Sequence, residues 1–242
     1  MDNETLARIR QIVRDARYVV FLGGAGVSTG SGIPDFRSPQ GIYHVKSKFG
    51  VPYEEMLSHE YFYEHPETFY EFYWECMVKK DAKPNKAHLA LAKFERMGHN
   101  ICVITQNIDG LHQDAGSHIV LEVHGSTKRY FCPICGKRYS LDEITPEGVP
   151  HCSCGAILKP DVVLYGEPLD EDTLTKAMAA TIHANVLIIG GTSLNVYPIA
   201  SLPSYFEGST KIIINKEETA YDSKCDYVIH EDIGEVLEQI LS

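Results

Sequence analysis

The sequence has no long apolar run and no excess of positive charge. No stretch reaches the roughly 18 apolar residues of a membrane span, and the opening Met1-Asp2-Asn3-Glu4 lacks the basic and apolar regions of a signal peptide. We therefore expect a cytoplasmic protein without a membrane partner. Lys and Arg number 22 against 33 Asp and Glu, a net charge of -11. This balance argues against direct nucleic-acid binding and favours cationic partners.

Internal repeats and low-complexity runs are also lacking. The composition, 44% hydrophobic and 23% charged, is that of a globular chain and excludes disordered, collagen-like and coiled-coil proteins. With about 150 residues as a common domain size, the 242 residues correspond to one large domain that carries an insertion.

Short apolar blocks alternate with helical patterns along much of the chain. Apolar residues recur at helical spacing from Thr5 to Arg17, and the apolar block Tyr18–Leu22 follows directly. Further blocks of this kind are Ile101–Ile104, Val186–Ile189, Lys211–Ile214 and Tyr227–Ile229. Unbroken apolar blocks separated by helices indicate a parallel sheet covered on both faces. The predicted fold class is α/β, a Rossmann-like doubly wound parallel sheet.

Two stretches depart from this alternation. Residues 41–83 are rich in aromatic side chains and predict a helical insertion, with the strongest helical pattern over Glu67–Val78. Residues 126–159 contain two cysteine pairs and little apolar periodicity. We predict that these two excursions form a smaller domain, and that residues 1–40, 84–125 and 160–242 form the Rossmann-like nucleotide-binding domain.

Four of the seven cysteines form two tight pairs, Cys132/Cys135 and Cys152/Cys154. This spacing is close to that of a zinc ribbon, in which two turns offer four thiolates to one tetrahedral ion. The single residue inside the second pair is still compatible with four ligands. Four thiolates leave no position for water, so we predict one structural Zn²⁺ ion, with His151 as an alternative ligand.

A glycine-rich loop, Gly23 to Gly32, follows the first predicted strand. Glycines let backbone amides approach a pyrophosphate. The spacing departs from the oxidoreductase fingerprint, whose third glycine would fall at Thr29, so a structural turn without a ligand is an alternative. Directly beyond the loop, Ile33-Pro34-Asp35-Phe36-Arg37 places a ring, a carboxylate and a guanidinium on a rigid turn, which favours a functional loop.

Together these residues resemble the signature of the sirtuins, NAD-dependent protein-lysine deacylases, in their bacterial type. Five further segments resemble family motifs in the family's order: Thr105–Asp109 with Leu111-His112, Glu122–Gly125, Lys159–Glu167, Gly191–Leu194 with Val196–Pro198, and Asn215–Glu217. The family often has Glu where Gly30 stands and Gly where Ser38 stands. These departures concern loop stiffness and peptide fit rather than the chemistry.

The resemblance implies that an acyl group moves from a protein lysine to the ADP-ribose of NAD while nicotinamide is released. It implies that His124 is the catalytic base and that Asn107 assists. The implied NAD-binding residues are Gly24, Ala25, Gly26, Ser28, Thr29, Phe36, Arg37, Gln106, Asn107, Ile108, Asp109, His124, Gly191, Thr192, Ser193, Asn215, Lys216, Glu217, Asp232 and Ile233. The implied peptide-binding residues, where an acetyl-lysine peptide would add a strand, are Val163, Tyr165, Gly166, Glu167, Asn195 and Val196.

The acyl preference and the reaction type leave alternatives. In the desuccinylase branch a Tyr and an Arg three residues later recognise the acid; Tyr73 falls near that place, but Cys76 stands where the Arg would be. We therefore expect a neutral acyl group such as acetyl, and simple helix packing for Tyr73. Alternative functions are NAD-dependent protein ADP-ribosyl transfer and an NAD-sensing module without turnover, although a mere binder needs neither His124 nor Asn107. A redox dehydrogenase fits least, because of the glycine spacing.

Overall fold

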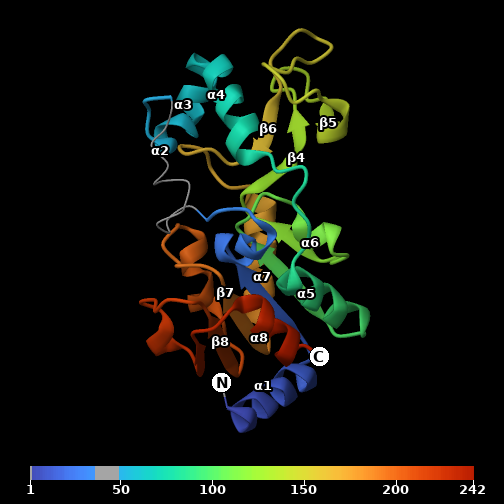
Figure 1. Ribbon diagram of the computed structural model, residues 1–242, viewed down its shortest axis with the longest axis vertical. Coiled ribbons are helices and arrows are strands. Elements are labelled where there is room, and N and C mark those ends of the chain that lie inside the picture. Colours follow the sequence, from blue (N-terminus) through green and yellow to red (C-terminus); the bar gives the residue numbers. More distant parts are fainter. Residues whose placement is uncertain (1, 36–48) are drawn as a thin grey trace.

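A six-stranded parallel sheet forms the centre of the larger part of the computed structural model, which describes residues 2–35 and 49–242 (Figure 1). The strands are β1 (Val19–Gly23), β2 (Ile101–Thr105), β3 (Val120–Glu122), β7 (Val186–Gly190), β8 (Thr210–Ile214) and β9 (Tyr227–Ile229). Their spatial order is β3-β2-β1-β7-β8-β9. From β1 the chain adds β2 and β3 on one side, and it then crosses over to add β7, β8 and β9 on the other side. This is the Rossmann order. The predicted fold class is confirmed.

Both faces of this sheet are covered. Along β1, Val19 and Phe21 belong to one hydrophobic core, whereas Val20 and Leu22 belong to another. The first core is closed by α1 (Asn3–Asp15), α5 (Lys86–Arg96) and α8 (Ile233–Ile240), and the second by α7 (Glu171–His183) and the 3-10 helix Ile199–Tyr205. Burial on both faces explains why the strands read as unbroken apolar blocks.

Polar side chains mark where these helices begin. Asp2 accepts a hydrogen bond from the Thr5 amide at 2.8 Å to cap α1, and Asp170 does the same for α7 through the Thr173 amide at 2.8 Å. Each such cap stabilises a helix by about 1 kcal/mol. Of the helices within residues 2–35 and 49–242, none has the length and apolar character that crossing a membrane requires.

Two excursions from the large sheet pack together at the other end of the molecule, far from both termini (Figure 1). The first contains α2 (Tyr53–Met56), α3 (His59–Glu64), α4 (Pro66–Phe72) and a π-helical turn at Tyr73–Met77; the second contains an antiparallel sheet of β4 (Gly125–Phe131), β5 (Arg138–Ser140) and β6 (Lys159–Val162). One hydrophobic core joins them, with Phe69 and Tyr70 on one side and Tyr130 and Leu158 on the other. This shared core supports a common small domain. The boundaries of this domain are a proposal. Two of them, after residue 125 and after residue 159, fall inside β4 and β6.

The predicted helix over Glu67–Val78 is divided into α4 and the π-helical turn. In that turn the Val78 amide donates to the Tyr73 carbonyl at 3.2 Å. The wider turn lets both Tyr73 and Trp74 face Tyr130, with ring centroids 6.4 and 5.8 Å apart. Tyr73 is fully buried in this aromatic core, which agrees with the packing role expected for it.

Gly125 lies where the chain passes from the large sheet to the small one, and its conformation generates a prediction. Its φ is 80°, and a Cβ there would lie 2.0 Å from the carbonyl oxygen of Asp161 on β6. We expect Gly125→Ala to lower the free energy of unfolding by roughly 3 kcal/mol, measured by denaturant unfolding. Gly98→Ala is the matched control, because φ is 93° there and no atom lies within 4 Å of the added Cβ. Equal losses in the two variants would contradict the steric argument.

Candidate active site and metal centre

The glycine loop lies at the carboxyl edge of the sheet, between β1 and β7, where the strand order reverses. The Gly24 amide donates to the Gly190 carbonyl at 3.3 Å, and the Gly26 amide donates to the Gly191 carbonyl at 2.9 Å. A Cβ on Gly26 would lie 2.8 Å from the Gly191 Cα. The two loops therefore approach more closely than larger residues allow, at the place where open α/β sheets bind ligands.

Three motif side chains form one hydrogen-bonded network beneath this loop. The Ser28 hydroxyl donates to Asp109 Oδ2 at 2.6 Å, and Asn107 Nδ2 donates to the Ser28 hydroxyl at 3.0 Å. Asp109 Oδ1 accepts from the Leu111 amide at 2.9 Å at the start of α6 (Leu111–Asp114). Ser28 and Asn107 are buried. The loops that follow β1 and β2 thus fix each other's polar side chains.

A second set of contacts extends this edge to β7 and β8. Gln106 Nε2 donates to the Thr192 hydroxyl at 3.0 Å. The Thr192 amide donates to Asn215 Oδ1 at 3.0 Å, and Asn215 Nδ2 donates back to the Thr192 carbonyl at 3.2 Å. The structure thereby brings the predicted residues of four loops to one edge of the sheet.

His124 lies in the connection between β3 and β4. Its Nδ1 is 3.0 Å from the Gln106 carbonyl oxygen. Since a carbonyl only accepts, Nδ1 carries the proton, and Nε2 is the basic nitrogen of the neutral ring. Burial lowers the pKa of His124, and the hydrogen bond to Gln106 opposes that shift only in part. The imidazole is therefore neutral at pH 7, as a general base requires.

The expected peptide-binding residues lie mostly at the surface. Tyr165, Gly166, Asn195 and Val196 are exposed. The Val163 amide donates to the His124 carbonyl at 3.0 Å, which connects this segment directly to the histidine. Glu167 differs from the others, because its carboxylate turns into the protein.

The remaining predicted NAD-binding residues differ in how far they are exposed to solvent. Lys216 is exposed, with Nζ 3.2 Å from Asp232 Oδ2. Ile233 is buried, and a Cβ added to Gly190 would lie 2.4 Å from the Ile233 Cδ1. Only the backbone of Ile233 could therefore contact a ligand. Thr29, Ser193 and Glu217 are exposed, and Ala25 and Ile108 are half-buried. Phe36 and Arg37 lie outside the described residues.

One residue that supports the loop was missed by the sequence reasoning. Asn85 Nδ2 donates to the Val27 carbonyl at 2.8 Å and to the Ser31 hydroxyl at 2.9 Å, while its Oδ1 accepts from the Ala87 amide at 2.9 Å to cap α5. An Asn immediately before a helical pattern was the available signal for the cap. No sequence signal points to its contact with a loop more than fifty residues earlier.

Two buried histidines lie behind the network, His88 on α5 and His112 on α6. Their ring centroids are 4.7 Å apart. Burial lowers the pKa of His88 to about 4, opposed in part by Asp109 and Asp114. Burial and then the charge of His88 lower the pKa of His112 to about 3. Both rings are therefore neutral in the folded protein near neutral pH.

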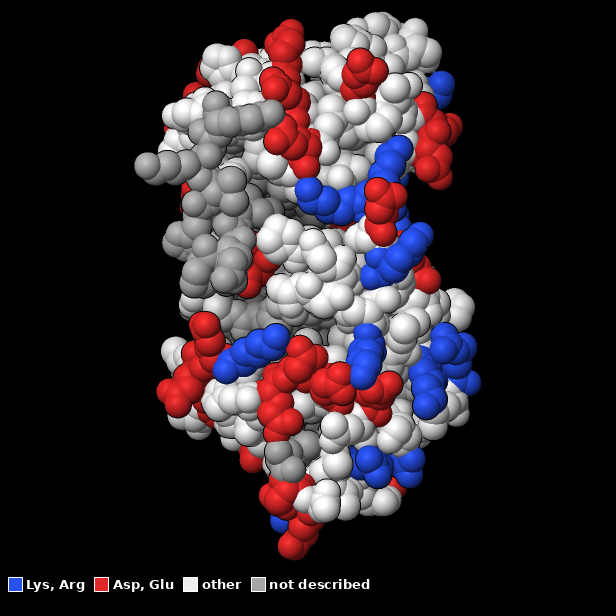
Figure 2. Space-filling view, in the orientation of Figure 1, with Lys and Arg blue, Asp and Glu red and all other residues white. Residues whose placement is uncertain are grey.

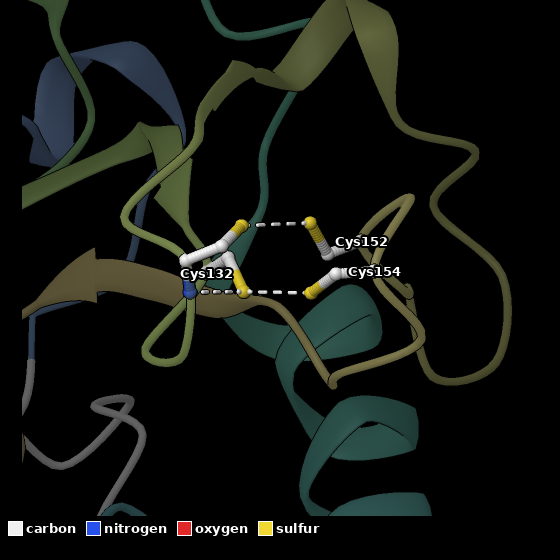
Figure 3. A group of neighbouring side chains, drawn as sticks. Cys132, Cys152 and Cys154 are labelled. Carbon is white, nitrogen blue, oxygen red and sulfur yellow. Dashed lines mark hydrogen bonds between the residues drawn. The ribbon is translucent and has the colours of Figure 1, made fainter.

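The four paired cysteines converge as predicted, and Figure 3 shows the sulfur atoms of Cys132, Cys152 and Cys154 facing one centre. All four sulfurs lie within 4.8 Å of one another, and the Cys132–Cys154 and Cys135–Cys152 distances are both 3.5 Å. A tetrahedral ion with thiolate bonds near 2.3 Å needs sulfurs about 3.8 Å apart, so the set fits Zn²⁺. His151 Nδ1 instead donates to the Val149 carbonyl at 2.8 Å.

Comparison with known proteins gives consistent matches over the whole chain. The model of the Sir2 family matches residues 24–198. An NAD-dependent protein deacetylase of Clostridium acetobutylicum is 50% identical over 241 residues, covering 98% of each chain, and one of Staphylococcus aureus is 42% identical over 238 residues, again covering 98% of each. A solved Sir2 homologue–NAD complex has a TM-score of 0.87 at 38% identity, covering 100% of this chain and 93% of that one. Sir2 bound to acetylated peptide has a TM-score of 0.85 at 35% identity, covering 100% and 98%.

The Rossmann order, the glycine loop at the switch point and the four-cysteine cluster define a nucleotide-binding α/β protein with a metal-binding module. The family can be stated as well. The chain belongs to the Sir2 family. The resemblance to sirtuins, which was based on the sequence motifs, is confirmed.

The cysteine cluster predicts that zinc holds the small sheet together. We expect about one zinc ion per purified chain, and we expect Cys154→Ser to lose the metal and melt at a lower temperature, because three thiolates bind zinc more weakly than four. Metal content by atomic emission and melting by calorimetry measure both effects. Cys225→Ser is the control, since Cys225 lies outside the cluster. A zinc content unchanged in Cys154→Ser would contradict this assignment.

The buried histidines predict a loss of stability in acid. Below about pH 6.5 the unfolded chain protonates both imidazoles while the folded chain does not, so the free energy of unfolding falls as pH falls, by about 1.4 kcal/mol per pH unit for each histidine. Urea unfolding between about pH 7.5 and about pH 5 measures this slope. His112→Leu should make it shallower, whereas His118→Leu should not, because the His118 side chain is 80% exposed. An unchanged slope in His112→Leu would be inconsistent with a neutral buried ring.

Proposed function

We propose that the chain is an NAD-dependent protein-lysine deacetylase, which transfers the acetyl group to ADP-ribose and releases nicotinamide, O-acetyl-ADP-ribose and the free lysine. The observation that carries this proposal is His124, held as a neutral base by Gln106 at the edge where the glycine loop and the Ser28–Asn107–Asp109 network meet. The curated relatives are named for this activity. A solved Sir2 structure holds a deacetylated p53 peptide together with 3'-O-acetyl ADP ribose.

The residues at the carboxyl edge fit NAD by the donors and acceptors that they place there. NAD, when bound, supplies a ribose carbon from which nicotinamide can leave. The Ala25 amide would help to hold the phosphates, whereas the amides of Gly24 and Gly26 already donate to Gly190 and Gly191 and fix the loop against the end of β7. Asn107 and Asp109 would orient the nicotinamide ribose and carboxamide, since hydrogen bonds already fix their side chains.

His124 would move one proton. Its Nε2 is the unprotonated nitrogen, so it would be the atom that accepts a proton from a ribose hydroxyl of bound NAD. The Gln106 carbonyl keeps the proton on Nδ1 and holds the ring plane in place. Burial keeps the ring neutral, and therefore basic, at physiological pH.

An acetyl-lysine peptide would lie along the exposed edges formed by Val163–Glu167 and Asn195–Val196, adding a strand between the two parts of the molecule. Cys76 stands where the desuccinylase branch has its Arg, and this supports a neutral acyl group, because that position offers no cation to an acid. The net charge of -11 favours lysine-rich peptides. On the face shown in Figure 2, acidic side chains gather on both the upper and the lower part, with Lys and Arg side chains between them.

We place the reaction in the cytoplasm. None of the seven cysteines, all of which lie within the described residues, forms a disulfide, which suits a reducing compartment. Four of them form the zinc cluster, and Cys102 is buried, where burial raises the pKa of its thiol to about 11 and keeps it unreactive.

The proposed reaction predicts a defined product ratio and a defined pH profile. With an acetyl-lysine peptide and NAD, we expect nicotinamide and deacetylated peptide in equal amounts, and a loss of about a hundredfold or more in kcat for His124→Asn. Because the pKa of His124 is lowered, the neutral base persists below about pH 6.5, and kcat/KM should fall only when the pH drops further. Mass spectrometry and a nicotinamide assay follow the products.

Two outcomes would contradict the proposal. ADP-ribose retained on the peptide would indicate ADP-ribosyl transfer, and NAD binding without turnover of any acylated peptide would indicate a sensing module. His118→Asn is the control for the histidine substitution, because His118 lies before β3, at the amino edge of the sheet.

A further inference from the structure

Glu167 closes the segment expected to receive the peptide, yet its carboxylate points into the protein. Oε1 accepts from His59 Nδ1 at 2.8 Å, and Oε2 accepts from the Leu164 amide at 2.9 Å and lies 2.9 Å from Lys159 Nζ. Only 14% of the side chain is exposed. Burial alone raises the pKa of Glu167, but the hydrogen bonds from His59, Leu164 and Lys159 outweigh it and keep the pKa below the usual range. Both carboxylate oxygens are therefore engaged within the protein.

Lys159 is a buried cation whose donors are all used. Besides Glu167, its Nζ donates to the Val162 carbonyl at 3.0 Å and to the Pro160 carbonyl at 3.3 Å. An ammonium has three protons, and these three partners satisfy them. The residue is 5% exposed, and a buried charge is tolerated only with such partners. Lys159 thus connects strand β6 to the turn that contains Glu167.

His59 connects the same turn to the helical excursion. Its amide donates to the Tyr165 carbonyl at 2.9 Å, and the Tyr165 amide donates to the Leu57 carbonyl at 2.9 Å. The turn itself is closed by the Glu167 amide, which donates to the Leu164 carbonyl at 3.0 Å, with Gly166 at φ 88°. The turn is therefore held from β6, from α3 and across its own base, while Tyr165 and Gly166 remain at the surface.

We propose that Lys159, Glu167 and His59 form a positioning clamp that holds Val163–Glu167 in the conformation that receives the acyl-lysine peptide. Glu167 acts through the turn and does not touch the peptide. The proposal rests on the proposed function, because it takes this segment as the peptide edge. It assigns roles to Lys159 and His59, and it changes the role expected for Glu167 from a peptide contact to a positioning residue.

The clamp and a direct peptide contact by Glu167 predict different effects of His59. If Glu167 bound the peptide itself, loss of the His59 ring would leave peptide affinity unchanged. If the clamp positions the turn, His59→Ala raises the KM for peptide about fivefold, the loss expected for one hydrogen bond to a charged group. The kcat and the KM for NAD stay within about twofold of the parent values, because the nucleotide edge is built from other loops.

The experiment compares His59→Ala with two further variants in steady-state kinetics. His59→Gln retains a side-chain donor and should recover most of the peptide affinity. His118→Ala is the matched control, since His118 Nδ1 makes a similar contact with Glu95 at 3.2 Å at the opposite edge of the sheet; it should leave the KM for peptide unchanged.

The buried pair needs a charge-balanced variant. Lys159→Met alone leaves an unpaired carboxylate inside the protein and is expected to impair folding. Lys159→Met combined with Glu167→Gln removes both charges at similar volume, and it should unfold near the parent midpoint while the KM for peptide rises as in His59→Ala.

Amide hydrogen exchange without substrate tests the clamp apart from the activity. In His59→Ala the Tyr165 and Glu167 amides should exchange about tenfold faster. Unchanged exchange overturns the clamp, and faster exchange with an unchanged KM for peptide overturns its positioning role. Faster exchange in a protein whose parent form deacetylates no peptide supports the clamp but contradicts the proposed function.

Discussion

One run of hydrogen bonds connects the glycine loop, His124 and the segment proposed to bind the peptide, and the arrangement of the site depends on it. The Gln106 amide donates to the Gly23 carbonyl at 3.0 Å, the Gln106 carbonyl accepts from His124, and the His124 carbonyl accepts from the Val163 amide at 3.0 Å. Gln106 uses its amide toward the glycine loop and its carbonyl toward the His124 ring, and His124 uses its own carbonyl toward Val163. Because every group in this run except the His124 ring belongs to the backbone, the fold sets the spacing between the glycine loop and the Val163 segment.

His124 lies at the joint between the two sheets, and an arginine bridges that joint. Arg129 on β4 reaches Glu122 at the end of β3 with Nη1 at 2.5 Å and Asp161 on β6 with Nε at 2.8 Å. The Arg129 guanidinium thus connects the end of β3 in the large sheet to β6 in the small sheet, and His124 lies in the connection between β3 and β4. A planar guanidinium suits this task better than a flexible ammonium, since its donors have fixed directions. A rotation of one sheet against the other would have to break the contact with Glu122, because Arg129 and Asp161 both belong to the small sheet.

The sequence predicts features that rest on local pattern and misses those that rest on distant partners. The apolar blocks identify the strands because burial on both faces removes polar alternation, and the spacing of Cys132, Cys135, Cys152 and Cys154 identifies the cluster because each pair spans one tight turn. The direction of the Glu167 carboxylate depends on His59, which is 108 residues away. No pattern near Glu167 carries that information. The domain boundaries are equally hard to place, because β4 and β6 belong to both the excursion and the joint.

The cysteine cluster is connected to the Val163–Glu167 segment through β4 and β6. Cys132 directly follows β4, whose last residue, Phe131, pairs with Lys159 at the start of β6. Lys159 in turn holds Glu167 and the carbonyl of Val162. Four thiolates that fix the end of β4 therefore also fix the register of β6, and with it the point from which Lys159 reaches the turn. The cysteine cluster thereby helps to fix the segment proposed to bind the peptide, and β4 also supports the loop after β2, because the Thr127 amide donates to the Ile108 carbonyl at 2.8 Å.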